Sequence, residues 1–116
     1  MQKILLVLAL IFIGFTVNAQ KRLSNDEFKS MMKDKNAQIL DVRTAKEVAE
    51  GKIENSVNFD YFSPKFMENA TKLDKNKPVL IYCAGGGRSL SAAKDLKKAG
   101  FKKVYDLRTG YDGWKE

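Results

Sequence analysis

Cys83 is the only cysteine in this chain, and its surroundings are typical of a nucleophilic site. It follows the apolar run 78–82 and precedes a loop that contains three glycines, Gly85 to Gly87. A strand that leads through a glycine loop into a helix directs backbone N–H groups and the positive end of the helix toward one point. Such surroundings favour a thiolate over a thiol. We therefore expect residues 83–88 to hold an anionic sulfur.

Arg88 strengthens this interpretation because it lies at the expected start of the following helix. A cation there opposes the helix dipole by about 0.3–1 kcal/mol, and no acidic residue occurs between Lys75 and Lys94 to offset it. A bound anion would remove the conflict. The alternative is that Cys83 is a small buried hydrophobic residue and the glycines a flexible connection. Three glycines in so short a link carry an entropic cost, which favours the functional interpretation.

The remaining sequence alternates short strands with short helices. Apolar runs predict strands at 37–42, 57–59, 78–82 and 104–107. Helices are predicted after Ser24, after Thr44, with Ser63 as cap and Pro64 as first helical residue, and from Ser89 to Ala99. Helices between strands require parallel pairing, and ligands of such sheets bind beyond the carboxyl ends of the strands. We expect an α/β fold whose parallel sheet of four or five strands has helices on both faces.

Helix boundaries have local signals. Ser24 with Glu27 and Thr44 with Glu47 have the spacing of capping boxes, in which each side chain bonds the other residue's backbone. Gly51 and Gly100 are placed to end helices in the left-handed conformation.

Residues 1–19 resemble a secretory signal peptide. Lys3 precedes an uncharged apolar stretch from Ile4 to Val17, and Val17-Asn18-Ala19 has a pattern that a signal peptidase recognises. The stretch is shorter than the roughly 20 residues that span a bilayer, although an uncleaved anchor remains the alternative. We expect cleavage before Gln20, which leaves one domain over 20–116, without a stable membrane span, in the periplasm or outside the cell.

Composition narrows the possible functions. The formal net charge is +7, or +6 without Lys3, but lysines and arginines are interspersed with acids and form no stripe with aromatic residues. Such a surface argues against nucleic-acid binding. One cysteine cannot form a disulfide within its chain, so a free thiol in an oxidising compartment needs burial or a use. The chain has no histidine, which excludes a Cys–His nucleophile pair and argues against a zinc site.

Four segments in this order resemble single-domain rhodaneses, which are sulfurtransferases. They are Ile39 to Arg43, Glu47 to Ile53, the loop from Cys83 to Ser89, and Gly110 to Trp114. The resemblance covers nearly all of residues 20–116. The resemblance implies a small three-layer rhodanese-like domain that needs no metal or organic cofactor, and we expect it to be a monomer.

The resemblance also implies roles for individual residues. Cys83 would take a sulfane sulfur from an anionic donor such as thiosulfate, and pass it as a persulfide to cyanide or a thiol. Arg88 would orient the donor. The loop that binds the substrate would consist of Ala84, Gly85, Gly86, Gly87, Arg88 and Ser89. Its amides and guanidinium would stabilise both the thiolate and the persulfide.

Three acidic and basic residues are expected to support the scaffold. We expect Arg43 to pair with Glu47, and Asp41 to accept hydrogen bonds from nearby backbone. An ordinary surface ion pair is the alternative. Trp114 is expected to anchor the C-terminus, while Tyr82 faces either the core or the site.

The sequence departs from the family pattern at three places. Lys52 stands where the family often has histidine, and Thr109-Gly110 stands where it often has two glycines, for which we expect only local packing changes. Ala84 stands where many thiosulfate-using members have a basic residue, which weakens the assignment of thiosulfate as the natural donor.

Two other functions compete with sulfur transfer. Tyrosine phosphatases and arsenate reductases place five residues between their cysteine and arginine, whereas only four separate Cys83 from Arg88. The shorter loop suits one sulfur atom better than a phosphoryl group. A non-catalytic secreted rhodanese-like module that carries sulfur or binds a protein is the second alternative.

Overall fold

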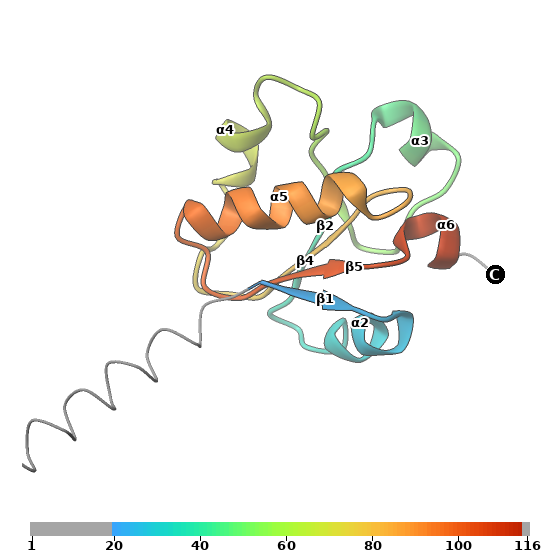
Figure 1. The fold of residues 1–116 in the computed structure, drawn as a ribbon, viewed down its shortest axis with the longest axis horizontal. Helices are drawn as coiled ribbons and strands as arrows, with labels where there is room; N and C mark the ends of the chain where they lie inside the picture. The colour runs from blue at the N-terminus through green and yellow to red at the C-terminus, as the bar shows by residue number, and fades with distance from the viewer. Residues whose placement is uncertain (1–19, 115–116) are drawn as a thin grey trace, which may run out of the picture.

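A five-stranded parallel sheet forms the centre of the fold (Figure 1). The computed structural model describes residues 20–114, so the expected signal peptide and its cleavage site before Gln20 are not tested by it. The strands are β1 (Lys21–Leu23), β2 (Gln38–Asp41), β3 (Val57–Asn58), β4 (Val79–Tyr82) and β5 (Val104–Leu107). Their spatial order is β1-β5-β4-β2-β3, and every pairing is parallel. The expected parallel sheet is confirmed, and the edge strand β1 is an addition to it.

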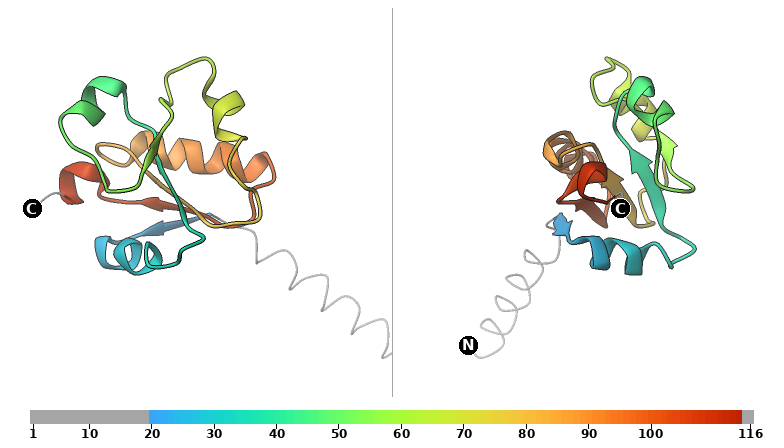
Figure 2. Two further views of the ribbon diagram at one scale, coloured as in Figure 1. Left: turned by 180° about the vertical axis from the view of Figure 1, so that it is seen from behind. Right: turned by 90° about the vertical axis from the view of Figure 1, so that its right-hand side faces the viewer.

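Helices cover both faces of this sheet (Figures 1 and 2). They are α2 (Asn25–Met31), α3 (Ala45–Ala49), α4 (Phe66–Ala70), α5 (Gly87–Lys98) and α6 (Gly110–Trp114). Residues of α4 and α5 pack with Leu40 and Ile81 on one face, whereas Phe28 of α2 packs with Leu80 on the other. Adjacent strand residues therefore serve opposite cores, as the alternation of side chains in a β-strand requires. The expected α/β architecture with two helical layers is confirmed.

The two predicted capping boxes are present. The Ser24 side chain accepts a hydrogen bond from the Glu27 amide, and the Glu27 carboxylate accepts one from the Ser24 amide. Thr44 and Glu47 make the same reciprocal pair at the start of α3. Gly100 follows α5 with a φ of +100°. These helix boundaries follow from local hydrogen bonding, which explains why the sequence predicts them.

Two helix starts differ from expectation, and one helix was not predicted. Helix α4 begins at Phe66 after Lys65, so the expectation of a Ser63 cap with Pro64 as the first helical residue was wrong. The Ser63 hydroxyl instead accepts from the Lys65 amide, which forms a turn ahead of the helix. Helix α5 begins at Gly87, two residues before the predicted start. Helix α6 was not predicted because tertiary hydrogen bonds to the Cys83 loop hold its first turn.

None of the helices α2 to α6 has the length and apolar character of a membrane span. Between residues 20 and 114, no helix is both long enough and apolar enough to cross a bilayer.

Candidate active site

Cys83 lies directly beyond the carboxyl end of β4, the strand flanked by β5 and β2. The residue is buried, with 1% of its surface exposed. The amide of Gly86 donates to Sγ at 3.0 Å and the amide of Ser89 at 3.4 Å. The Ser89 hydroxyl oxygen lies 3.5 Å from the same sulfur. Two backbone donors converge on Sγ, which is the arrangement that stabilises negative charge on sulfur.

The conformation of Gly86 makes this convergence possible. Gly86 caps the N-terminus of α5 with a φ of +103°, in the region that favours glycine. A Cβ atom at this position would also collide with the carbonyl oxygen of Arg108. A Cβ at Gly85 or Gly87 would meet open space. The three glycines suggested a curled backbone. Of these positions, only Gly86 requires glycine.

A buried network that the sequence analysis missed holds the same loop from the side of β1. The Arg22 guanidinium donates to the Gly86 carbonyl at 2.7 Å and to the Asp106 carboxylate at 2.9 Å. The Ser89 hydroxyl lies within hydrogen-bond distance of Gly86 O and Asp106 Oδ2, at 3.2 and 3.3 Å. Asp106 is fully buried on β5. The sequence offers one signal for Asp106. A carboxylate within an apolar strand is expected to be buried, and a buried carboxylate requires a partner.

Helix α6 fixes the other side of the loop. The amide of Tyr111 donates to the Cys83 carbonyl at 2.7 Å, and the amide of Asp112 donates to the Ala84 carbonyl at 3.0 Å. Gly110 has a φ of +68°, and a Cβ there would collide with the Ala84 carbonyl. The close approach of the two backbones thus requires glycine at 110. No such close approach constrains position 109, so threonine can replace the first glycine of the pair.

Arg88 pairs with a carboxylate that lies far away in the sequence. Its two terminal nitrogens donate to the two oxygens of Glu47 at 2.8 and 2.9 Å. The ring of Phe62 lies 5.2 Å from the guanidinium carbon. The hydrogen bond from Arg88 lowers the pKa of Glu47 to about 2. The charge conflict seen in the sequence is therefore resolved by Glu47 of α3, without any bound anion.

Asp41 and Arg43 form a separate buried pair beneath the site. Arg43 donates to Asp41 Oδ2 at 2.7 Å, and its backbone amide donates to Asp41 Oδ1 at 3.0 Å. The expectation that Asp41 accepts from nearby backbone is confirmed. The expected pairing of Arg43 with the Glu47 carboxylate was wrong: Arg43 reaches only the Glu47 carbonyl, at 3.4 Å. The Glu47 carboxylate is already engaged by Thr44 and Arg88.

Tyr82 belongs to this buried cluster and is fully buried. Its hydroxyl donates to Asp41 at 2.8 Å and accepts from the Ile53 amide at 3.0 Å. Burial raises the pKa of Tyr82. Trp114 packs edge-on against Phe28, with ring centroids 5.6 Å apart, as an anchor of the C-terminal helix. Both aromatic residues therefore support the scaffold.

A small hollow of about 140 Å³ lies beside the loop, where Ala84 forms part of its wall. Its other lining residues are Arg43, Glu47, Glu50, Tyr111 and Asp112. The carboxylate side chains in this lining outnumber the basic ones. Cys83 does not line the hollow, so Sγ lies beneath the loop and is not open to it.

Known proteins share this fold and this order of motifs. The rhodanese-like domain family matches residues 24–116. A protein named thiosulfate sulfurtransferase GlpE, from Coxiella burnetii, is 38% identical over 95 residues, which are 82% of this chain and 87% of that protein. A tRNA uridine(34) hydroxylase of Pelagibacter ubique is 32% identical over 103 residues, but only 34% of that protein is covered.

A solved structure gives the same result. The crystal structure of a rhodanese-like domain protein from Staphylococcus aureus superposes with a TM-score of 0.73 at 31% identity, and the match covers 83% of this chain and 92% of that one. The family match reaches from the start of α2 to the last residue of the chain and includes the Cys83 loop. The chain belongs to the rhodanese-like domain family.

Proposed function

We propose that this protein is a sulfurtransferase in which Cys83 carries the transferred sulfur as a persulfide. The observation that carries this proposal is the pair of backbone amides, from Gly86 and Ser89, aimed at Sγ. Such donors stabilise a thiolate before transfer and a charged persulfide after it. The name of the Coxiella burnetii relative, a thiosulfate sulfurtransferase, agrees with this chemistry.

The proposed reaction has two displacement steps at sulfur. The Cys83 thiolate attacks the sulfane sulfur of the donor, the S–S bond of the donor breaks, and the leaving group departs with the electron pair. When the donor is thiosulfate, the leaving group is sulfite. A nucleophilic acceptor, cyanide or a thiolate, then attacks the outer sulfur of the persulfide. The Cys83 thiolate is released, and no external oxidant or reductant is needed.

The loop residues have separate roles in this proposal. The amides of Gly86 and Ser89 hold the sulfur charge, whereas Ala84, Gly85 and Gly87 shape the turn around it. Because Cys83 is only 1% exposed, the packing keeps bulk water away from the persulfide. A donor reaches Sγ by displacing part of this covering. The burial therefore favours transfer of a single sulfur atom over reaction with a bulky ester.

Mass spectrometry tests the proposal directly. The purified protein is incubated with thiosulfate, and intact mass is compared for the wild type and Cys83→Ser. We expect the wild type to gain one sulfur atom, to lose it on addition of cyanide, and to release thiocyanate repeatedly under steady-state conditions. The Cys83→Ser variant should do none of these.

Two other results would change the assignment. Stoichiometric persulfide without turnover would identify a sulfur carrier instead of an enzyme. No persulfide with thiosulfate or with an organic persulfide would leave only a protein-binding module. Either outcome contradicts the enzymatic proposal.

We also propose that the domain works after export, in the periplasm or outside the cell, as a monomer. The support is the pattern of residues 1–19, which has a basic start, an apolar stretch and a small-residue cleavage site. The mass of the protein isolated from its native cells should correspond to a chain that begins at Gln20. A full-length chain recovered with the membrane fraction would indicate an uncleaved anchor.

A further inference from the structure

We propose that Glu47 sets the donor preference of this site, by neutralising Arg88 and so disfavouring thiosulfate relative to organic persulfides. The inference rests on the proposed sulfurtransferase function and specifies its donor. Thiosulfate is a dianion, whereas the reacting end of an organic persulfide carries no more than a single negative charge. A site with no uncompensated cation discriminates against the first of these donors.

The contacts of Arg88 are the first observation behind this proposal. Its guanidinium binds both oxygens of Glu47, while one ring face of Phe62 lies 5.2 Å away. Glu47 raises the pKa of Arg88 most, and the charges of Cys83 and Asp60 raise it further. A carboxylate in bidentate contact leaves little net positive charge for a second anion. Arg88 therefore stands at the loop as half of an ion pair.

Two other arginines near the loop, Arg22 and Arg43, are compensated in the same way. Arg22 pairs with Asp106 at 2.9 Å, and Arg43 pairs with Asp41 at 2.7 Å. Each of these carboxylates is fully buried. Arginine side chains thus surround the loop, but each has its own carboxylate partner.

The hollow beside the loop adds to the negative charge. Glu50 and Asp112 line it together with two residues that are already paired, Glu47 and Arg43. Ala84 supplies only a methyl group to this wall. A dianion that approaches along this wall meets carboxylates.

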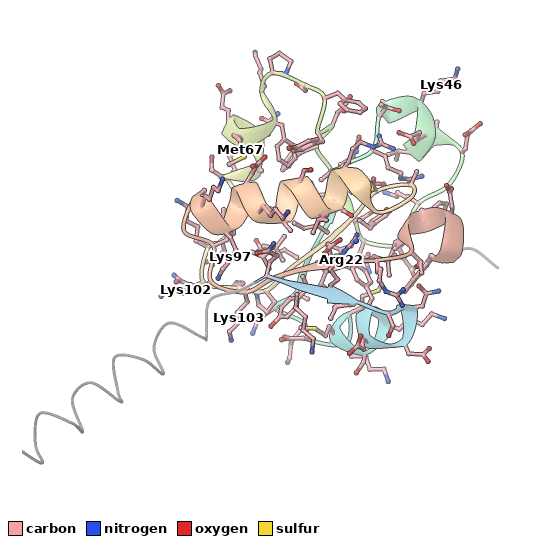
Figure 3. All side chains as sticks on the ribbon, viewed as in Figure 1. Arg22, Lys46, Met67, Lys97, Lys102 and Lys103 are labelled. Carbon is pink, nitrogen blue, oxygen red and sulfur yellow. The ribbon has the colours of Figure 1, made fainter. Side chains whose placement is uncertain are left out.

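Several lysines point away from the site. Lys97, Lys102 and Lys103 gather at the end of the domain opposite to the Cys83 loop, and Lys46 points outward from α3 (Figure 3). A surface charge separated by more than the Debye length, about 8–10 Å at physiological salt, has little effect on a donor at Sγ. The net charge of +7 therefore does not make the site itself cationic.

Charge balance in the first step shows where the preference arises. With thiosulfate, the Cys83 thiolate and a dianion become a persulfide anion and sulfite, so charge of one sign accumulates in the transition state. With an organic persulfide, the thiolate attacks the terminal sulfur, the S–S bond breaks, and an organic thiolate leaves. The second reaction gathers less negative charge beside Glu47. It therefore depends less on a free guanidinium.

Single-turnover loading of Cys83 tests this proposal. Rates of sulfur gain by intact mass are measured with thiosulfate and with cysteine persulfide, for the wild type and for Glu47→Gln. Glutamine retains the capping-box contacts to Thr44, so α3 is preserved while the charge is removed. We expect Glu47→Gln to raise the second-order rate with thiosulfate by about three- to tenfold, the effect of freeing one cation near an anion. The rate with cysteine persulfide should change less than about twofold.

Two further variants make the result specific. Glu50→Gln removes an equal charge from the same hollow but has no bond to Arg88 in the structure, so it should raise the thiosulfate rate less than Glu47→Gln does. In the double variant Glu47→Gln/Arg88→Met, the gain with thiosulfate should disappear because the freed cation is absent.

The failures of the two proposals are distinguishable. If the wild type loads from both donors and Glu47→Gln leaves the ratio of the two rates unchanged, the role of Glu47 is refuted and the sulfurtransferase function stands. If the wild type loads from neither donor, the function itself is refuted. A gain that persists without Arg88 would also contradict the proposal.

Discussion

Two arginine–carboxylate pairs flank the Cys83 loop, and they differ in burial far more than in chemistry. Arg43 and Asp41 lie beneath the site, with 4% and 0% of their side-chain surfaces exposed. Arg88 and Glu47 lie at the loop surface, with 19% and 31% exposed. Both contacts are short and both guanidiniums bind two oxygens. A buried pair holds the scaffold because neither partner can return to water, whereas a half-exposed pair can be exchanged for other charges.

The largest expected effect comes from breaking the buried pair. Asp41→Asn should lower the free energy of unfolding by about 3–5 kcal/mol, because Arg43 then lies buried without a compensating charge. This is a large part of the total of about 5–15 kcal/mol expected for a domain of this size. Urea denaturation measures it. Glu47→Gln is the matched control at the surface pair, with an expected change of at most about 1 kcal/mol. Equal losses in the two variants would contradict the distinction drawn from burial.

A third pair, Arg22 with Asp106, is intermediate in burial, because Arg22 is 35% exposed and Asp106 is fully buried. Arg22 also binds the Gly86 carbonyl, so Arg22→Ala should loosen Gly86, whose amide donates to Sγ. We expect the rate of Cys83 alkylation by iodoacetamide at neutral pH to fall by about two- to tenfold, as for one lost hydrogen bond. Arg22→Lys should recover part of the rate, and Lys21→Ala should leave it unchanged. An unaltered rate in Arg22→Ala would show that Arg22 does not position the loop.

The surface pair, Arg88 with Glu47, should make the stability of the domain depend on pH. Because Arg88 lowers the pKa of Glu47 from 4.5 to about 2, the pair contributes stability above pH 4.5 and loses it as the pH falls through about 2. Thermal unfolding of the wild type and Glu47→Gln between pH 7 and pH 2 measures this contribution. The Tm advantage of the wild type should shrink toward the acid end. Since both side chains are partly solvated, we expect no more than about 1 kcal/mol. A constant Tm difference would exclude the pair as its source.

Removing the exposed ring of Phe62 should have the smallest effect. Phe62 is 69% exposed and lies over Arg88, so Phe62→Ala removes a cation–π contact worth about 0.5–1 kcal/mol at a solvated site. A double-mutant cycle with Arg88→Met isolates that interaction. A coupling energy well above 1 kcal/mol would mean that the loop surface is as rigid as the buried cluster.

Local signals in the sequence were enough to predict most of the regular elements, but not β1 or α6. The capping boxes at Ser24 and Thr44 depend on residues three positions apart, and the parallel sheet follows from apolar runs that alternate with helices. The position of Cys83 beyond a central strand follows from the same reasoning. These features need no knowledge of distant contacts, because the interactions that determine them lie within a few residues.

Partners that come from distant parts of the chain could not be assigned in this way. Glu47 was expected to bind Arg43, four residues away, but it binds Arg88, which lies 41 residues further along. Asp106 and Arg22 were not recognised as part of the site, although they lie against the Cys83 loop. Ion pairing has no sequence period, so several carboxylates compete for each arginine until the fold brings one within reach.

Residue types and their spacing were sufficient to identify the family, the strand–loop–helix unit around Cys83 and the expectation of an anion near Arg88. The folded chain was needed to show that this anion is the Glu47 carboxylate, how deeply the sulfur is buried, and which two amides reach it. Local propensities act along the chain, whereas burial and charge pairing depend on which strands become neighbours in the sheet.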